Sequence, residues 1–275
     1  MSDSIKNVFK MEEYQNDICE VYNFQIEKVI KDHYPTKVVQ VHKTLDPNRK
    51  WAVKMCYKDK THKCISAERH FLTEVIILRG LKHPFIMGLD NVASFPYYFC
   101  FVMPFYEDGM LTKALPTMTH ELRDECLVQL CCGIKFLHDR GVAHRDLKSD
   151  NILLTMQKNV VIADFGLGDY VWRREPLVTG KKGTYMHISP EQGEEPFNCF
   201  KCMLYRVDVI DLKSKEPLLT IVSQTFHVPD IDRDILSCLL EADPIKRLSV
   251  LSLINLLSNS KLFDHRIKLL RESTI

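Results

Sequence analysis

The spacing of apolar residues is strand-like at the start of this chain and then becomes helical, and that change limits the possible folds more than any other feature. Between Phe24 and Tyr57, apolar and polar residues alternate in three segments, FQIEKVI, KVVQVH and WAVKMCY, as they do in half-buried strands. Cys64–Leu81 then has helical spacing, and His83-Pro84 ends it. We therefore expect the chain to begin with a small sheet and one helix.

The rest of the chain is predicted to be mainly helical. His120–Arg140 has helical spacing, with Thr119 as a candidate N-cap and Gly141 at the expected C′ position. The apolar stripe LSVLSLINLL indicates another helix near the end. Short strands are expected at 92–95, 97–103, 152–154 and 160–163, and TLDPNRK is the expected hairpin loop before the third strand. A small β-rich lobe thus precedes a larger helical lobe, which predicts an α+β fold.

Composition and charge exclude several classes of protein. The chain has 275 residues, which at about 150 residues per domain allows two domains or one two-lobed domain. Hydrophobic residues make up 45% and charged residues 27%, as in globular rather than disordered proteins. With 37 Lys and Arg against 36 Asp and Glu, the formal net charge is +1. Charge therefore gives no reason to expect nucleic acid or an anionic membrane as a partner.

The sequence predicts an intracellular protein. Its first residues, MSDSIKNVFKMEEYQND, are too polar for a signal peptide, and no run of about 18 apolar residues would span a membrane. Ten cysteines are scattered, and only Cys199 and Cys202 have CxxC spacing, without a second pair to complete a metal site. Free thiols in a reducing compartment are expected. No basic cluster of the nuclear-import type decides between cytoplasm and nucleus.

One stretch carries most of the chemistry. His144–Asn151 reads HRDLKSDN, and Asp164-Phe165-Gly166 follows just after an apolar strand. Upstream, Lys54 ends the tripeptide Ala-Val-Lys in the third alternating segment, and Glu74 stands twenty positions later on the predicted helix. Six positions of the first stretch match the pattern HRDLKxxN, which arises by chance in such a chain about a few times in a million. This combination is therefore a strong signal.

These motifs resemble those of eukaryotic protein kinases, over about Phe24–Phe263, and Lys148 with Thr184 resembles the serine/threonine class. The resemblance implies the two-lobed protein-kinase fold, with a small antiparallel β-sheet lobe carrying one main helix and a larger, mainly α-helical lobe. The implied domains are an N-terminal extension (1–23), a kinase domain (24–264) and a C-terminal tail (265–275). Within the kinase domain the implied parts are an N-lobe (24–103), a hinge (104–109) and a C-lobe (110–264).

The same resemblance implies the roles of five residues. Asp146 would act as the catalytic base toward the substrate hydroxyl, and Lys148 would offset charge on the transferred phosphoryl group. Asn151 and Asp164 would hold Mg²⁺, a hard cation that prefers oxygen ligands. Lys54 would reach the α- and β-phosphates of ATP. The implied cofactors are ATP and Mg²⁺.

Further residues are implied to contact the nucleotide. Glu74 would pair with Lys54, Met103 would be the gatekeeper before the hinge, and Val38, Ala52 and Leu153 would enclose the adenine ring. Taken singly, each of these three is equally well explained as a core residue. The implied nucleotide-contacting set is Ile30, Lys31, Val38, Ala52, Lys54, Glu74, Met103, Phe105, Leu153 and Asp164.

An activation segment is implied from Asp164 to Glu191. Ser189-Pro190-Glu191 stands where the family usually has Ala-Pro-Glu, and Glu191 is expected to pair with Arg247. Arg145 precedes Asp146, so it is expected to grip a phosphate that an upstream kinase places on Thr179. An unmodified exposed threonine is the alternative. Asp150 suggests protein substrates with basic residues.

The chain departs from the family in three places, of which the third is a trimmed C-lobe: the segment before Phe226-His227-Val228-Pro229 is shorter than usual. Lys31, His33 and Thr36 stand at the three positions of the glycine-rich loop, where glycine lets the backbone approach phosphates. Lys31 or His33 would contact phosphate there, or would be plain surface residues. In KCMLYRVDVI, Met203 replaces the usual buried Asp, and a thioether cannot supply its two strong acceptors; Asp208 replaces a Gly.

Three functions are therefore weighed. The first is an active serine/threonine protein kinase that uses Mg-ATP. The second is a pseudokinase that acts as a binding scaffold, favoured by the missing glycines and the trimmed C-lobe. The third is a small-molecule phosphotransferase with a kinase-like fold. Gly183-Thr184, Ser189-Pro190-Glu191 and Arg247 belong to the protein-substrate apparatus and argue against the third.

Overall fold

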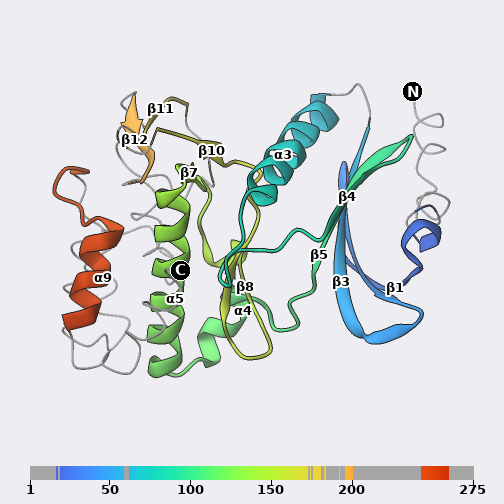
Figure 1. Ribbon diagram of the computed structural model, residues 1–275, viewed down its shortest axis with the longest axis horizontal. Coiled ribbons are helices and arrows are strands. Elements are labelled where there is room, and N and C mark those ends of the chain that lie inside the picture. The colour runs from blue at the N-terminus through green and yellow to red at the C-terminus, as the bar shows by residue number, and fades with distance from the viewer. Residues whose placement is uncertain are drawn as a thin grey trace. The chain divides into compact units, whose positions relative to one another are not determined.

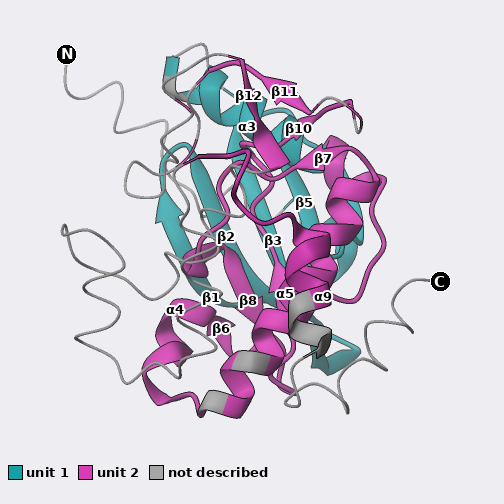
Figure 2. Ribbon diagram, turned by 90° about the vertical axis from the view of Figure 1, so that its left-hand side faces the viewer, with its two compact units in different colours: residues 1–75, 88–105 teal, residues 76–87, 106–275 magenta. Residues whose placement is uncertain are grey.

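The structure is a computed structural model that describes residues 17, 19–58, 62–172, 174, 176–180, 183, 192, 196–200 and 243–259. The chain divides into two compact units (Figure 2). Unit 1 comprises Met1–Val75 and Gly88–Phe105, and unit 2 comprises Ile76–Met87 and Tyr106–Ile275. Several predictions lie outside the described residues. They concern Thr184, Ser189-Pro190-Glu191 with its ion pair to Arg247, Cys202, Met203 and Asp208.

Unit 1 contains a five-stranded antiparallel sheet (Figure 1), in the order β1-β2-β3-β5-β4. The three alternating segments form its first three strands, as predicted, and the predicted helix is α3 (His62–Arg79). The strands are β1 (Phe24–His33), β2 (Thr36–Lys43), β3 (Asp46–Tyr57), β4 (Asn91–Ser94) and β5 (Tyr98–Pro104).

The predicted loop TLDPNRK is wrong in its second part. β3 begins at Asp46, which pairs with Lys43, so only Thr44 and Leu45 connect β2 to β3. Pro47 is the second residue of the strand and lies beside a register shift after His42. The start of a strand and an irregular register are the places where a sheet tolerates a residue without an N–H.

One face of this sheet carries an apolar core. Val39, Val41 and Val53 are fully buried there, together with Phe24, Trp51, Met55, Tyr98, Cys100 and Val102. Residues 19–22 are helical, an element that the polar N-terminal sequence did not predict. Tyr22 packs against this core and stacks on Phe24, with ring centroids 5.6 Å apart. The apolar core on this face of the sheet therefore includes Tyr22, which precedes β1.

Unit 2 is built around α5 (His120–Asp139), which contacts both β9 (Val160–Ile162) and α9 (Val250–Asn259). The predicted cap is present, because Thr119 Oγ1 accepts a hydrogen bond from the Leu122 N–H at 3.3 Å. Gly141 follows the helix with φ +68°, as a left-handed C′ residue should. The other described elements are β6 (Gly109–Met110), α4 (Leu111–Ala114), η2 (Leu115–Thr117), β7 (Val142–Ala143), η3 (Ser149–Asn151), β8 (Ile152–Leu154), β10 (Asp169–Tyr170), β11 (Leu177–Val178) and β12 (Phe197–Asn198).

Three small antiparallel sheets in unit 2 position its loops. They pair β6 with β8 and β9, β7 with β10, and β11 with β12. The described elements give the α+β class that the sequence predicts, with a sheet-based unit and a second unit organised by helices. Among the described residues, no helix combines the length and the apolar character needed to cross a bilayer.

Candidate functional site

The loop after β7 and the residues after β9 meet because β8 and β9 form an antiparallel pair, with Ile152 opposite Ile162. Residues that precede β8 and residues that follow β9 therefore lie at the same end of the pair. The Ala163 N–H donates to the Asn151 carbonyl at 2.9 Å. This contact brings Asn151 close to the residue before Asp164.

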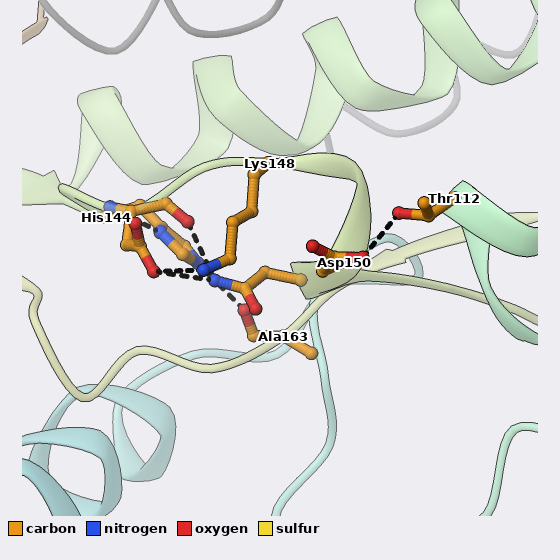
Figure 3. Close-up of polar contacts among 7 residues, drawn as sticks. Thr112, His144, Lys148, Asp150 and Ala163 are labelled. Atoms are coloured by element: carbon orange, nitrogen blue, oxygen red, sulfur yellow. Dashed lines mark hydrogen bonds and ion pairs between the residues drawn. The ribbon is translucent and has the colours of Figure 1, made fainter. Parts of the chain in front are cut away.

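His144 strengthens this junction from inside unit 2. It is fully buried, and its Nε2 donates to the Ala163 carbonyl at 2.9 Å (Figure 3). Its Nδ1 accepts the Asp146 N–H at 3.2 Å, so the imidazole is held as the neutral Nε2–H tautomer. The ring also lies 4.7 Å from that of Phe165, between centroids. His144 thus joins the HRDLKSDN loop to the Asp-Phe-Gly segment.

The Asp146 carboxylate is held from two directions. Asn151 Nδ2 donates to the Asp146 carbonyl at 2.8 Å and to its Oδ2 at 3.1 Å. Lys148 Nζ lies 3.1 Å from the same Oδ2, reaching back across the loop (Figure 3). Asp146 is 7% exposed, so these contacts balance a buried charge and fix its orientation. The arrangement presents a carboxylate beside a cation.

Asn151 and Asp164 fit a Mg²⁺ ion that arrives with a nucleotide. Both side-chain hydrogen bonds of Asn151 use Nδ2, so its amide oxygen makes none with the described residues. Asp164 is exposed, with φ +63°. No group of three His, Cys, Asp or Glu side chains suited to a metal occurs in the described part of the chain. Two oxygen ligands match Mg²⁺, which usually completes its shell with water and phosphate oxygens.

Lys54 and Glu74 form an ion pair within unit 1. Lys54 Nζ on β3 lies 2.5 Å from Glu74 Oε2 on α3, and Glu74 is 1% exposed. The ammonium group also lies 5.8 Å from the centre of the Phe101 ring. The pair holds the lysine head group at a fixed point beside the sheet.

The predicted nucleotide-contacting residues of unit 1 share one face of the sheet. Directly paired residues point to the same side, and the register places Lys31, Val38, Lys54 and Phe101 in one row and Gln40, Ala52 and Met103 in the next. Ile30 lies in a register shift between Val29 and Lys31 and is 44% exposed. Phe105 follows β5, and its N–H donates to the Lys50 carbonyl at 3.3 Å. Leu153 lies on β8 in unit 2.

The segment without glycines is a closed hairpin. β1 and β2 remain paired to His33 and Thr36, so only Tyr34 and Pro35 form the turn. The Tyr34 hydroxyl and Cys64 Sγ on α3 are joined by a hydrogen bond of 2.9 Å. Tyr34 also stacks on Tyr57 of β3, with centroids 6.1 Å apart. Side chains therefore anchor this turn to the rest of unit 1.

Sequence reasoning missed a polar network on the same face of the sheet. Gln40 is 2% exposed and donates from Nε2 to Glu27. Glu27 also lies 3.0 Å from His42 Nδ1 and 3.3 Å from Lys50 Nζ. The alternation in β2 marks Gln40 as polar but does not reveal that both faces of the strand are covered. The one sign of this network in the sequence was the polar residue Gln40 inside the segment KVVQVH.

The residues expected to face protein substrates lie in unit 2. Asp150 is exposed, and its Oδ1 accepts a hydrogen bond from Thr112 Oγ1 at 2.7 Å (Figure 3). Thr179 is exposed too, and its carbonyl accepts from Arg145 Nη2 at 3.3 Å. Arg145 also forms an ion pair with Asp169, which the sequence did not single out.

The sequence is similar to the sequences of known protein kinases. The sequence pattern of the protein kinase domain matches residues 36–196. CBL-interacting serine/threonine-protein kinase 18 of Arabidopsis thaliana is 35% identical over 146 residues, which cover 52% of this chain and 28% of that protein. Serine/threonine-protein kinase 33 of Bos taurus is 27% identical over 239 residues, 75% of this chain and 49% of the relative. Serine/threonine-protein kinase CST20 of Candida albicans is 37% identical over 100 residues, 34% of this chain and 8% of the relative.

The chain thus spans half or less of the length of these relatives. The matched pattern nevertheless covers more than half of the chain and includes the loop 144–151, the Asp-Phe-Gly segment and the Lys54–Glu74 pair. The chain belongs to the protein kinase family.

Proposed function

We propose that this protein is a serine/threonine protein kinase, which transfers the γ-phosphate of Mg-ATP to hydroxyl groups of protein substrates. The observation that carries the proposal is the Asp146 carboxylate, held by Asn151 and Lys148 in a loop that is joined to the Asp-Phe-Gly segment. The three relatives named above are all serine/threonine-protein kinases, which supports this class.

In the proposed mechanism, Asp146 orients the substrate hydroxyl and accepts its proton as the oxygen attacks. Lys148, 3.1 Å from this carboxylate, offsets negative charge on the phosphoryl group in transit. Asn151 Nδ2 keeps the carboxylate in one orientation through its hydrogen bond to Oδ2. These groups do positioning and charge compensation, which is what phosphoryl transfer demands of a protein.

The cofactor-binding part of the proposal concerns residues of each unit, taken separately. Asn151 and Asp164 would ligate Mg²⁺, which when bound neutralises charge on the phosphates. Lys54, fixed by Glu74 at 2.5 Å, would contact the α- and β-phosphates. Val38, Ala52 and Met103 lie on the sheet face that carries Lys54, where an apolar adenine ring would pack.

Substrate class and regulation extend the proposal. The exposed Asp150 favours substrates with basic residues, and a peptide array without preference for Arg or Lys would contradict this. Thr179 is proposed as a phosphorylation site for an upstream kinase, because its side chain is exposed and its carbonyl contacts Arg145. If the intact mass of active protein shows no phosphate, phosphorylation of Thr179 is not needed for activity and this part of the proposal is wrong.

One observation favours a second function, a pseudokinase that acts as a scaffold. The hairpin that replaces the glycine-rich loop is anchored by Tyr34 to Cys64 and Tyr57. Side chains also occupy the positions where backbone would approach phosphates.

Phosphate transfer from labelled ATP, with Mg²⁺ and a basic protein substrate, separates the two functions. Wild type is expected to transfer phosphate, and D146N is expected to lose the activity while still binding nucleotide. If wild type transfers no phosphate, even after an upstream kinase has phosphorylated Thr179, the scaffold is the correct function.

A further inference from the structure

A buried arginine lies at the junction of three segments in unit 2. Arg145 is 4% exposed. Its φ of +63° places its backbone in the left-handed region, which is uncommon for a residue other than glycine. Its Nη1 donates to Asp169 Oδ2, and its Nη2 donates to the carbonyls of Thr179 (3.3 Å) and Gly180. One guanidinium group therefore ties together the loop 144–151, β10 and residues 179–180.

The local topology puts Asp169 next to Arg145. β10 pairs with β7 in an antiparallel ladder, with Asp169 opposite Ala143, two residues before Arg145. The carboxylate is 34% exposed, whereas the guanidinium is almost completely buried. A buried cation that loses its anion is strongly destabilising. Asp169 thus supplies negative charge where the fold needs it.

Among the described residues, a short strand pair also supports the segment that Arg145 holds. Residues 177–178 form the two-residue strand β11, paired with β12, and Gly180 follows with φ +80°. Phe197 of β12 is buried, and its ring centre lies 5.9 Å from the Arg145 guanidinium. The side chain of Arg145 thus contacts both sides of this short ladder, through the 179–180 carbonyls and through Phe197.

We propose that Asp169 is a positioning residue. Its carboxylate neutralises and orients the Arg145 guanidinium, which in turn holds residues 177–180 in place without a phosphate on the chain. The proposal deepens the regulation of the proposed kinase site and rests on that function only for its kinetic readout. The order of residues 177–180 would then not depend on a phosphate at Thr179, and the regulatory effect proposed for that phosphate would be something other than ordering this segment.

The first test is D169N, which keeps the shape of the side chain and removes its charge. We expect amide hydrogen exchange of residues 177–180 to accelerate at least about tenfold, with α5 unchanged, because the anchor of that segment weakens. KM for a protein substrate should rise several-fold while KM for ATP stays constant. The matched control is D139N, which removes the surface ion pair of Asp139 with Lys135 at 2.5 Å and should change neither readout.

A charge-rescue experiment completes the test. In the D169N background, T179D supplies a new carboxylate near the guanidinium and should restore most of the lost protection and substrate KM. In the wild-type background T179D should have little effect. If D169N alone does not fold, the double variant D169N/T179D should fold with residues 177–180 protected.

Three outcomes would overturn the proposal. They are unchanged exchange at 177–180 in D169N, uniform acceleration across unit 2, or a double variant that remains unfolded or unprotected when D169N cannot fold alone. A wild-type protein without phosphate transfer would instead count against the proposed function. The exchange measurement still decides the role of Asp169 in that case, so the two failures are distinguishable.

Discussion

Lys54 Nζ and Glu74 Oε2 lie 2.5 Å apart, and this contact joins the middle strand of a sheet to the helix that follows it. The two residues stand twenty positions apart in the sequence. Because Glu74 is almost fully buried and Lys54 is 20% exposed, the carboxylate fixes a cation that solvent still reaches. We interpret the buried Glu74 carboxylate as a group that positions Lys54 more than it stabilises the fold.

E74Q tests that interpretation. The substitution keeps the size of the side chain but removes the charge that holds Lys54, so ATP affinity should fall about tenfold or more. The free energy of unfolding should fall by roughly 1–3 kcal/mol, the cost of leaving a buried polar group poorly paired. Fluorescent-nucleotide titration and urea unfolding measure the two effects. E68Q on the same helix is the control, and equal ATP affinity in both variants would contradict the assigned role.

Stability should decrease in mildly acidic solution because of two histidines, the buried His138 and the half-buried His83. Burial lowers the pKa of His138 to about 3 and that of His83 to about 4, from an ordinary value of 6.5. The unfolded chain therefore binds protons that the folded chain refuses, and the stabilisation present above pH 6.5 is lost progressively as the pH falls toward 4. His138 stacks on Phe200 at 3.9 Å between ring centroids, so it has no room to hydrate a charge.

H138Q should reduce this dependence. Urea unfolding at pH 7 and at pH 5 gives the difference in unfolding free energy for each protein, and the difference should be smaller in H138Q than in wild type. An identical difference in the two proteins would show that His138 contributes nothing to the acid sensitivity.

Much of the site was predictable because its residues have fixed spacing. The loop 144–151, the Asp-Phe-Gly segment and the Lys54–Glu74 contact were expected because their motifs resemble those of protein kinases. Periodicity likewise predicted β1, β2 and β3, and the caps of α5 marked its ends. A local sequence pattern predicts structure well where only a few residue types can fill each of its positions.

Other features depend on contacts between segments that no local pattern encodes. Nothing in the sequence distinguishes Asp169 from other acidic residues. In the structure, the pairing of β10 with β7 brings it to Arg145. Gln40 looks like a solvent-facing position, because the sequence does not tell that the second face of β2 is also covered. The start of β3 at Asp46 was missed because Asp-Pro usually indicates a turn, and the sheet overrode that preference.

The closed hairpin between β1 and β2 should depend on Tyr34. Y34F removes only the hydrogen bond to Cys64 and should lower the unfolding free energy by about 1 kcal/mol or less. Y34A also removes the stacking on Tyr57, so it should cost more and should accelerate hydrogen exchange in residues 31–37. Equal exchange in wild type and Y34A would mean that strand pairing alone closes the hairpin.

Gly133 marks a close approach between α5 and β9. A Cβ at this position would lie 2.9 Å from Ile162 Cδ1 and 3.4 Å from the Phe85 carbonyl oxygen. G133A should therefore destabilise the protein by up to about 2 kcal/mol, because overpacking in a full core costs about 1–3 kcal/mol and alanine gains back roughly 1 kcal/mol in a helix. I162V removes Cδ1 and by itself should cost about 0.5–1.5 kcal/mol. In the double variant G133A/I162V the loss should be smaller than the sum of the single losses, since the atom that clashes is gone. Thermal or urea unfolding of the four proteins gives the coupling, and strictly additive losses would mean that the helix and the strand move apart to admit the methyl group.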